Sequence, residues 1–310
     1  MIDPILRRPC GRARLELARL GVGTGTLANA GGADQFDAMI DAAWASGLRH
    51  FDTAAFYLGG ESERRLGVAL SGRPRNEYIL STKAGRYLDG SGSRFDYSRD
   101  GFLRSVYASL HRLQVEWLDI VMIHDLTPEQ HGAQYKTRLD EAVGGAYVAL
   151  EELRRQGLVR AIGIGAMSWQ ACLNLSRRCP LDCIMLAGDY TLLRHESGPL
   201  LEHCLAADIA VLVASPFNTG ILATGAIAGA RYLYQPAPAD ILDRTRALEA
   251  ICQRHGVPLA AAALQFPLRH PAVTSVVAGH QMPSEIEQNL DLLRQPTSAE
   301  FWAELSAASR

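Results

Sequence analysis

Four features that would each indicate a particular class of protein are missing from this sequence of 310 residues. No apolar run reaches the roughly 18 residues that a bilayer-crossing helix needs. The opening residues hold no apolar stretch of about 7–15 residues, so we expect neither a membrane span nor a secretory signal. Charge of one sign is not in excess, because 31 lysines and arginines face 33 aspartates and glutamates, which removes the electrostatic argument for a nucleic-acid or anionic-membrane partner. Long low-complexity tracts are also missing, which disfavours disorder.

Metal-binding patterns are missing as well. The chain holds six cysteines, and the closest two, Cys179 and Cys183, have the spacing C-x3-C without a second pair at zinc spacing. Neither an H-E-x-x-H motif nor a carboxylate cluster occurs, so we expect no metal site. Because we expect no secretory signal, we place the chain in the reducing cytoplasm. We interpret the cysteines as buried apolar residues, with a redox or metal role as the alternative.

Short apolar runs rich in β-branched residues alternate with longer segments of helical periodicity. Most of the runs are continuously apolar, as parallel strands covered on both faces are. The expected strands are Leu20–Gly23, Leu48–Asp52, Tyr78–Lys83, Leu118–His124, Ala161–Gly165, Cys183–Leu186, Ile209–Ala214 and Val273–Ala278. The expected helices are Gly32–Ser46, Glu61–Leu70, Arg99–Leu113, Asp140–Gln156, Trp169–Arg178, Leu200–Ala207, Ile241–His255, Ser284–Leu293 and an extra one within Pro258–His270. This alternation predicts a (β/α)8 TIM barrel, formed as a single domain by residues 1–310.

Three segments add detail to this fold prediction. Gly23–Ala28 fits the loose G-x-G-x-x-G/A pattern after a first strand, which makes a doubly wound dinucleotide-binding fold the alternative. Its glycines equally suit close backbone approach at the mouth of a barrel. We also expect a hairpin over Leu6–Leu17, turning at Cys10-Gly11, across the barrel floor, and an active-site loop over Thr219–Pro238.

Side chains with proton-transfer chemistry follow three consecutive expected strands. Asp52, Lys83 and His124 stand at the strand ends, and Tyr57 follows Asp52 by five residues. In a barrel the carboxyl ends of the strands form the active site. A tyrosine has an ordinary pKa of about 10, which we expect the Lys83 cation to lower. Asp52 would then hold Lys83, His124 would orient a substrate oxygen, and Tyr57 would exchange a proton while a cofactor exchanges hydride.

From Leu20 to about Leu293 the sequence resembles the aldo-keto reductases. The matching segments are FDTAAFYLGGESERRLG, STKAG, LDIVMIHD, ALEELRRQGLVRAIGIG, ASPFNTGIL and PSEIEQNL. The resemblance implies a (β/α)8 barrel, a nicotinamide cofactor across the strand ends, and Asp52, Tyr57, Lys83 and His124 as the catalytic tetrad. The cofactor-binding residues that it implies are Gly23, Thr24, Asp52, Ser215, Pro216, Phe217, Asn218, Gly220, Gly279, Glu285 and Asn289. Its closest likeness is to a branch that oxidises L-fucose, other aldoses or L-galactose to lactones and includes pyridoxal 4-dehydrogenase.

The chain departs from the common family pattern where the nicotinamide amide is held. Many relatives have a Ser-Asn pair, a glutamine and a stacking aromatic residue, where this chain reads Ala166-Met167-Ser168, Asp189 and Ala214. These changes either weaken cofactor binding or leave Met167, Asp189, Ser215 or Asn218 to supply other contacts.

A second departure concerns the choice between NAD and NADP. Gly279 and Glu285 occupy the positions where relatives that prefer NADP carry a lysine and an arginine for the 2′-phosphate. A carboxylate repels that phosphate but accepts a hydrogen bond from a free ribose hydroxyl, so we predict NAD over NADP. The alternative is that Glu285 only favours the first turn of a helix.

We therefore predict an NAD-dependent dehydrogenase that oxidises a sugar or cyclic hemiacetal to a lactone. The alternatives are an NADPH-dependent carbonyl reductase, a nicotinamide-binding barrel with little turnover, and a lyase or isomerase that uses Lys83 as a Schiff-base amine. Leu58, Tyr87, Asp125 and the segment Thr191–His195 are candidates for the substrate pocket. We expect a small-molecule sugar or aldehyde substrate, no nucleic-acid or membrane partner, and a monomer or homodimer.

Overall fold

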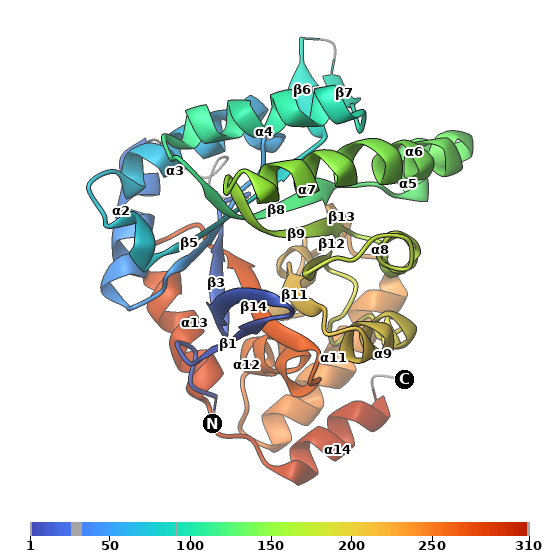
Figure 1. Cartoon of the computed structure of the whole chain (residues 1–310). Coiled ribbons are helices and arrows are strands. Elements are labelled where there is room, and N and C mark those ends of the chain that lie inside the picture. The colour runs from blue at the N-terminus through green and yellow to red at the C-terminus, as the bar shows by residue number, and fades with distance from the viewer. Residues whose placement is uncertain (1, 26–32, 91, 309–310) are drawn as a thin grey trace.

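Eight parallel strands close into a barrel at the centre of the computed structural model, which describes residues 2–25, 33–90 and 92–308 (Figure 1). Each strand pairs in parallel with the next, and the last pairs back onto the first. The barrel strands are β3 Leu20–Gly23, β4 His50–Asp52, β5 Ile79–Ala84, β8 Leu118–His124, β9 Val159–Ala166, β10 Cys183–Ala187, β11 Ala210–Ala214 and β14 Val273–Gly279. The predicted (β/α)8 fold is confirmed.

The doubly wound alternative is wrong, because its sheet stays open whereas this one closes. The closing contact joins β14 to β3, with Gly279 opposite Gly23. The glycine pattern that suggested the alternative therefore follows a barrel strand. Its last three residues, Thr26–Ala28, lie outside the described residues.

Helices form the outer layer around the barrel (Figure 1). The longer ones are α2 Ala33–Ala45, α3 Glu61–Leu70, α4 Arg99–Leu113, α6 Tyr135–Glu141, the π-helical η4 Ala142–Ala146, α7 Tyr147–Arg155, α8 Trp169–Ser176, α9 Gly198–Ala206, α11 Ala239–Arg254, α12 Leu259–Gln265, α13 Ser284–Arg294 and α14 Ala299–Ala308. The short ones are η1 Tyr57–Gly60, η2 Arg75–Glu77, α5 Pro128–His131, η3 Gly132–Gln134, η5 Asn218–Gly220, α10 Ile221–Thr224 and η6 Pro267–Arg269.

The expected helices are present, with differences at their ends. The one expected over Asp140–Gln156 begins earlier, because α6, η4 and α7 run on from Tyr135 without a break. The first expected residue of α2, Gly32, lies outside the described residues. The C-terminal helix α14, which buries Phe301 and Trp302, is an addition to the helices whose bounds were expected.

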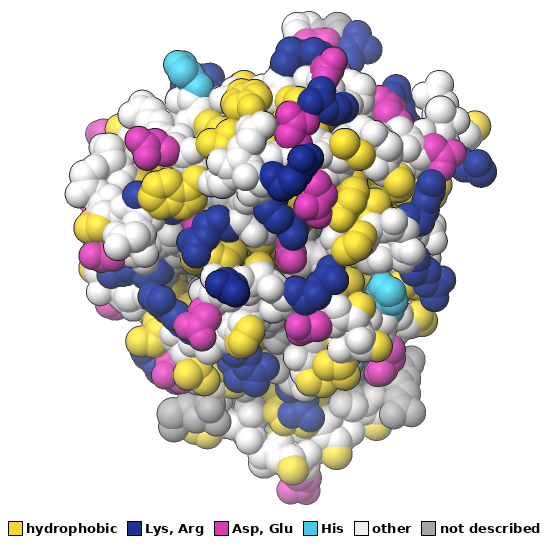
Figure 2. Space-filling model, viewed as in Figure 1, with side chains coloured by type: hydrophobic (Ala, Val, Ile, Leu, Met, Phe, Trp, Pro, Cys, Tyr) yellow, Lys and Arg dark blue, Asp and Glu magenta, His cyan; other side chains and the backbone are white. Residues whose placement is uncertain are grey.

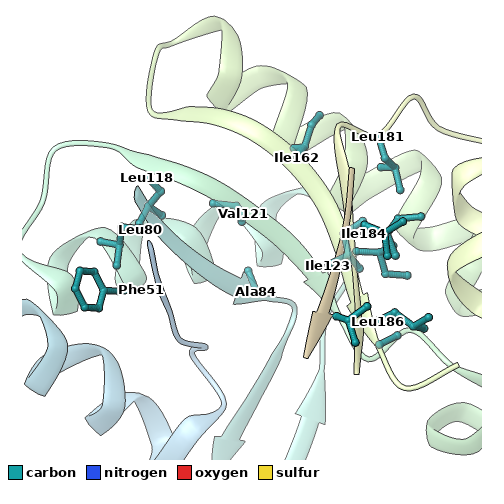
Figure 3. Close-up of a cluster of buried hydrophobic side chains, with 14 of the residues drawn as sticks. Phe51, Leu80, Ala84, Leu118, Val121, Ile123, Ile162, Leu181, Ile184 and Leu186 are labelled. Carbon is teal, nitrogen blue, oxygen red and sulfur yellow. The ribbon is translucent and has the colours of Figure 1, made fainter. Parts of the chain in front are cut away.

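Alternate residues of a barrel strand face two different cores. In β8, Val121 and Ile123 lie in the cluster between barrel and helices, part of which Figure 3 draws, whereas Ile120 and Met122 lie in the barrel interior. This alternation follows from the two-residue period of a strand. Because both faces are covered, the strand reads as a continuous apolar run.

A hairpin closes the floor of the barrel, as predicted. β1 Arg7–Cys10 pairs with β2 Ala13–Ala18, and Leu15 and Leu17 pack into the interior cluster. Cys10 still belongs to β1, so the turn falls at Gly11 and Arg12 rather than at Cys10-Gly11. Gly11 has φ +52°, and a Cβ there would lie 2.3 Å from the carbonyl oxygen of Asp182, so the close approach requires glycine.

Two further hairpins stand at the opposite, carboxyl end of the strands. β6 Arg86–Asp89 and β7 Gly92–Phe95 follow β5 and were not expected from the sequence. The expected loop over Thr219–Pro238 contains α10 and the hairpin of β12 Arg231–Tyr232 with β13 Gln235–Pro236. These segments border the strand ends at which the candidate residues lie.

Figure 2 shows basic and acidic side chains interspersed over the face that it draws. All six cysteines are buried and free, as interpreted from the sequence. Within the described ranges, no helix has the length and apolar character needed to cross a bilayer.

Candidate active site

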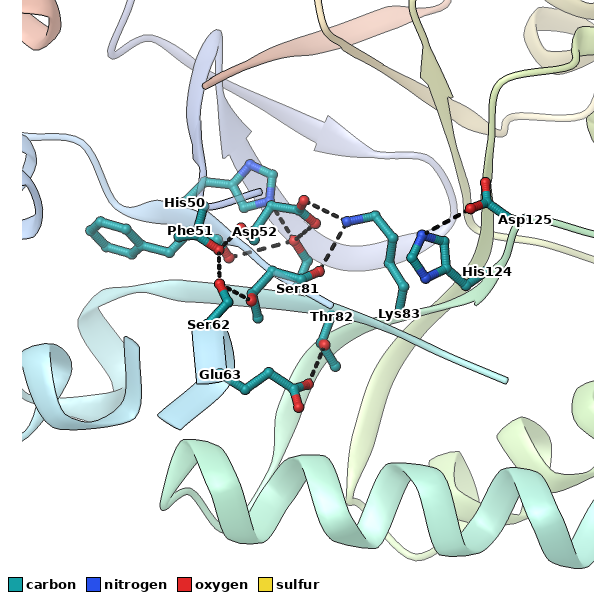
Figure 4. A network of polar contacts seen from close by, with 12 residues as sticks. His50, Phe51, Asp52, Ser62, Glu63, Ser81, Thr82, Lys83, His124 and Asp125 are labelled. Atoms are coloured by element: carbon teal, nitrogen blue, oxygen red, sulfur yellow. Dashed lines mark hydrogen bonds and ion pairs between the residues drawn. The ribbon is translucent and has the colours of Figure 1, made fainter. Parts of the chain in front are cut away.

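Three of the four predicted catalytic residues stand at the ends of three neighbouring barrel strands (Figure 4). Asp52 ends β4, Lys83 is the last residue but one of β5, and His124 ends β8. The fourth, Tyr57, opens η1, the short helix that follows β4. We call this group the catalytic arc.

The Asp52 carboxylate and the Lys83 ammonium form a buried ion pair. Lys83 Nζ lies 2.6 Å from Asp52 Oδ2, donates to the carbonyl oxygen of Thr53 at 2.9 Å, and both side chains are 4% exposed. Burial by itself lowers the pKa of Lys83, but Asp52 and Tyr57 outweigh it and raise that pKa above its ordinary value. Lys83 therefore stays protonated at neutral pH, which counts against the Schiff-base alternative.

Tyr57 contacts both the cation and the imidazole of this group. Lys83 Nζ lies 5.1 Å from the centroid of the Tyr57 ring, and the ring meets that of His124 edge-on at 5.9 Å between centroids. Burial raises the pKa of Tyr57, while the Lys83 charge opposes that rise. Lys83 lowers the pKa of Tyr57 as expected, but removing the phenol from water outweighs the lysine, so the pKa lies above its ordinary value.

His124 is a buried, neutral imidazole. Burial lowers its pKa to about 4, so the ring is uncharged at neutral pH. Its Nε2 lies 3.5 Å from Asp125 Oδ2, and within the described part of the chain Nδ1 has no hydrogen-bond partner. Tyr97 fixes the strand end by donating its hydroxyl to the carbonyl oxygen of His124 at 2.8 Å.

A polar network behind the catalytic arc holds Asp52 in place (Figure 4). Ser81 Oγ donates to Asp52 Oδ1 at 2.7 Å and lies 3.1 Å from His50 Nε2. Gly21 leaves room for this histidine, since a Cβ there would lie 2.6 Å from His50 Nδ1. Sequence reasoning missed His50 and Ser81, because they lie within strands and belong to no recognisable motif.

The hydroxyl of Thr24 belongs to the same network. It lies 3.0 Å from the carbonyl oxygen of Asp52 and 2.7 Å from Ser62 Oγ, fully buried. Thr24 was predicted to bind cofactor, but its side chain is engaged in fixing the end of β4. Gly165 supports Lys83 in a different way, because a Cβ there would lie 3.2 Å from Lys83 Cδ.

The predicted cofactor residues gather on three strand ends next to the catalytic arc. β11, β14 and β3 are consecutive in the barrel and lead directly to β4. Gly23 ends β3, Gly279 ends β14 and Ser215 follows β11, so these segments meet although they are far apart in the sequence. We call them the cofactor arc. Its remaining predicted members lie in the turn Pro216, Phe217, Asn218 and Gly220 and on α13, which holds Glu285 and Asn289.

Asn218 carries a buried acceptor without a partner among the described residues. Its side chain is 1% exposed and donates through Nδ2 to the carbonyl oxygen of Gly188 at 3.1 Å. Its Oδ1 is buried without a hydrogen-bond partner among the residues that the structure describes. A buried acceptor in this state costs free energy unless a ligand N–H or O–H meets it. The cofactor arc therefore fits a ligand that carries an amide or hydroxyl donor.

The other residues suggested to contact the nicotinamide amide differ in their exposure and in their hydrogen bonds. Asp189 is buried and engaged, since Oδ2 accepts from the backbone N–H of Trp169 at 2.8 Å and Oδ1 lies 2.6 Å from Arg194 Nη2. Met167 is 38% exposed just after β9. Glu285 is half-buried, and its Oε2 accepts from the backbone N–H of Gln281 at 2.6 Å.

The candidates for the substrate pocket differ in their exposure. Leu58 and Tyr87 are exposed near Tyr57 and on β6. Asp125 adjoins His124. In the segment Thr191–His195, Thr191 and Arg194 pair through their backbones, and Leu192 and Leu193 are buried in the core.

Known proteins similar to this chain agree with the site. A sequence model of the Aldo/keto reductase family matches residues 19–310. The D-threo-aldose 1-dehydrogenase of a Pseudomonas species is 37% identical, over 96% of this chain and 95% of that protein. The pyridoxal 4-dehydrogenase of Microbacterium luteolum is 36% identical over 96% of each chain.

A solved aldo-keto reductase from Bacillus halodurans, in its holo form, superimposes with a TM-score of 0.82 at 25% identity, covering 99% of this chain and 97% of that one. The match in sequence thus extends to the whole barrel. Together with the strand-end constellation, these likenesses identify the chain as a nicotinamide-dependent oxidoreductase that acts on carbonyl or alcohol groups, a member of the aldo/keto reductase family.

Proposed function

We propose that this protein is an NAD-dependent dehydrogenase that oxidises the hemiacetal form of an aldose, or of pyridoxal, to a lactone. The observation that supports it most is the catalytic arc, in which a fixed cation and a neutral imidazole both contact Tyr57. The similar D-threo-aldose 1-dehydrogenase and pyridoxal 4-dehydrogenase support the substrate class. We further propose that residues 1–310 act as one domain.

In this reaction Tyr57 is the general base. The anomeric hydroxyl gives its proton to Tyr57 while the anomeric carbon gives hydride to the nicotinamide, so the carbon loses two electrons and becomes the lactone carbonyl. The base is the deprotonated form of Tyr57, a minor form at neutral pH because burial raises the pKa of the phenol. The Lys83 charge stabilises this tyrosinate against burial, and Asp52 fixes the position of that charge. His124 stays neutral and can donate a hydrogen bond to the substrate oxygen.

The cofactor arc supplies binding rather than proton transfer. We assign the nicotinamide cofactor to the ends of β11, β14 and β3, with Asn218 Oδ1 as an acceptor for it. We assign NAD rather than NADP because Glu285, in the first turn of the helix that follows β14, carries a carboxylate instead of a cation. Its bond to the Gln281 N–H holds that carboxylate at the start of α13.

Fluorescence titration with NADH and NADPH tests the cofactor assignment first. We expect tighter binding of NADH, and a Glu285→Arg variant should shift the NADH/NADPH affinity ratio toward NADPH by about 10-fold, since removing one charge repulsion changes the binding free energy by roughly 1–2 kcal/mol. Glu287→Arg on the exposed side of α13 is the matched control. An unchanged ratio in Glu285→Arg would show that this glutamate only serves its helix.

The substrate assignment is tested by following NADH formation with L-fucose, other aldoses and pyridoxal. Lactone formation supports the proposal. Turnover only with NADPH and carbonyl compounds would replace it with a carbonyl reductase. Cofactor binding without turnover of any substrate would indicate a nicotinamide-binding barrel.

A further inference from the structure

Asp125 carries a charged side chain immediately beside the catalytic imidazole. It follows β8 with the left-handed φ of +49°, and its backbone N–H donates to the carbonyl oxygen of Gly165 at 2.9 Å. This bend brings the carboxylate back to the catalytic arc, where Oδ2 lies 3.5 Å from His124 Nε2 (Figure 4). An aspartate tolerates this backbone conformation better than most residues do.

Arg86, the first residue of β6, neutralises this carboxylate from the hairpin above the strand ends. Its Nη1 contacts Asp125 Oδ2, and its Nε donates to Ser93 Oγ at 3.1 Å. The guanidinium lies 3.7 Å from the centroid of the Phe56 ring, which itself meets His124 edge-on. A stacked guanidinium with two fixed hydrogen bonds has little freedom left to move.

The Asp125–Arg86 ion pair is partly buried, neither at the open surface nor shielded completely from solvent. Each side chain is 15% exposed, so solvent or a ligand reaches it. Arg86 and His124 both contact the same carboxylate oxygen of Asp125, Oδ2. Partly buried charges are costly to keep, and the proposed chemistry of Tyr57 and Lys83 does not need this pair.

The geometry points to a subsite in which Asp125 and Arg86 bind the hydroxyl groups on the carbons next to the reacting carbon. The carboxylate accepts from one hydroxyl and the guanidinium donates to another, a combination suited to a polyhydroxylated hemiacetal and of no use to an apolar aldehyde. This inference rests on the proposed function for the direction of the reaction, but the hydroxyl recognition itself does not depend on that direction.

The test compares substrates with and without neighbouring hydroxyls in Asp125→Asn and Arg86→Gln variants. For L-fucose oxidation and for D-glyceraldehyde reduction we expect kcat/KM to fall roughly 10- to 100-fold, the range for losing a hydrogen bond to a charged group. For reduction of 4-nitrobenzaldehyde we expect kcat/KM to change by less than about threefold, because this substrate has no hydroxyl group to bind to the pair. Asp89→Asn and Arg94→Gln, an exposed ion pair on the same hairpin, are the matched controls.

Each outcome has a separate meaning. Equal losses for all three substrates would overturn the inference and leave Asp125 as a positioning residue for His124. Unchanged kinetics in both variants would overturn it as well, while aldose oxidation by the wild type would keep the proposed function intact. A selective loss with D-glyceraldehyde in a wild type that oxidises no aldose would support the subsite and overturn the proposed function.

Discussion

The catalytic arc and the cofactor arc lie side by side on one barrel rim but are built in different ways. In the catalytic arc, the Asp52 carboxylate accepts from Lys83, and it also accepts from Ser81 of the network behind the arc. In the cofactor arc the chain turns through left-handed residues, with Ser215 at φ +53° and Asn218 at +45°. Reactive side chains define the first region, and backbone turns define the second.

This contrast follows from the tasks of the two regions. Proton transfer needs charged groups held at fixed positions, and such groups can be fixed by each other inside a dry site. A cofactor brings its own polar groups, so the proposed cofactor site keeps an unused acceptor, Asn218 Oδ1. We therefore expect substitutions in the catalytic arc to affect rate and stability, and substitutions in the cofactor arc to affect affinity.

Replacing Tyr57 by Phe should have the largest effect. Removing the proposed general base should lower kcat by about 10³-fold, within the range for general acid–base catalysis. It should leave the NADH dissociation constant within twofold of the wild type. Steady-state rates and fluorescence titration measure the two quantities. Tyr107→Phe, at an exposed tyrosine of α4, is the control. A large loss of NADH affinity in Tyr57→Phe would break the proposed separation of the two arcs.

Replacing Lys83 by Met should destabilise the fold, because it leaves the Asp52 carboxylate buried without its cation. Removing one partner of a buried pair costs about 3–5 kcal/mol of unfolding free energy. Urea denaturation measures this cost. The double variant Asp52→Asn/Lys83→Met should recover most of it, because no buried charge then remains. A single variant as stable as the double one would show that Asp52 finds other compensation.

Acid should lower the free energy of unfolding through two buried histidines at the catalytic arc and in the network behind it. Burial lowers the pKa values of His50 and His124 to about 4, whereas an unfolded histidine titrates near 6.5. Between these values the unfolded chain binds more protons than the folded one, so stability falls as pH drops from about 6.5 toward 4. Each histidine contributes at most roughly 3 kcal/mol to this loss.

Urea midpoints at pH 7, 6 and 5 measure the slope of stability against pH. His50→Gln should flatten it, and His111→Gln, on the exposed face of α4, should leave it unchanged. An unaltered slope in His50→Gln would place the acid sensitivity in other groups.

The same contrast explains which parts of the site could be predicted from the sequence. Asp52, Lys83 and His124 were visible because each follows an apolar run, and the ends of parallel strands meet at one rim. The hairpin of β6 and β7 was not visible, since Arg86–Phe95 alternates polar and apolar residues only briefly and contains two glycines. Its Arg86 approaches Asp125 through tertiary structure alone, 39 residues along the chain.

The hydrogen bonds of individual side chains could not be predicted either. The sequence pattern suggested cofactor contacts for Thr24 and Asp189. It could not indicate that the Thr24 hydroxyl bonds to Asp52 and Ser62. Nor could it indicate that the Asp189 carboxylate bonds to Trp169 and Arg194. The direction of the net pKa shift of Tyr57 could not be predicted either, because burial raises this pKa and the Lys83 charge lowers it. Their balance depends on packing that no local pattern encodes.

The smallest expected effect tests whether the cofactor arc uses any side chain at all. Asn218→Gly removes the buried Oδ1 acceptor, together with the Nδ2 bond to Gly188, yet permits the left-handed backbone, so affinity should change without added backbone strain. We expect the NADH dissociation constant to rise about 10-fold, equivalent to one hydrogen bond of roughly 1.4 kcal/mol. Thr219→Gly is the matched control, because Thr219 lies in the same turn at φ +64° and engages its hydroxyl with the N–H of Tyr234. Equal losses of NADH affinity in the two variants would mean that the backbone of the turn holds the cofactor. The catalytic arc would then act through side chains and the cofactor arc through backbone alone.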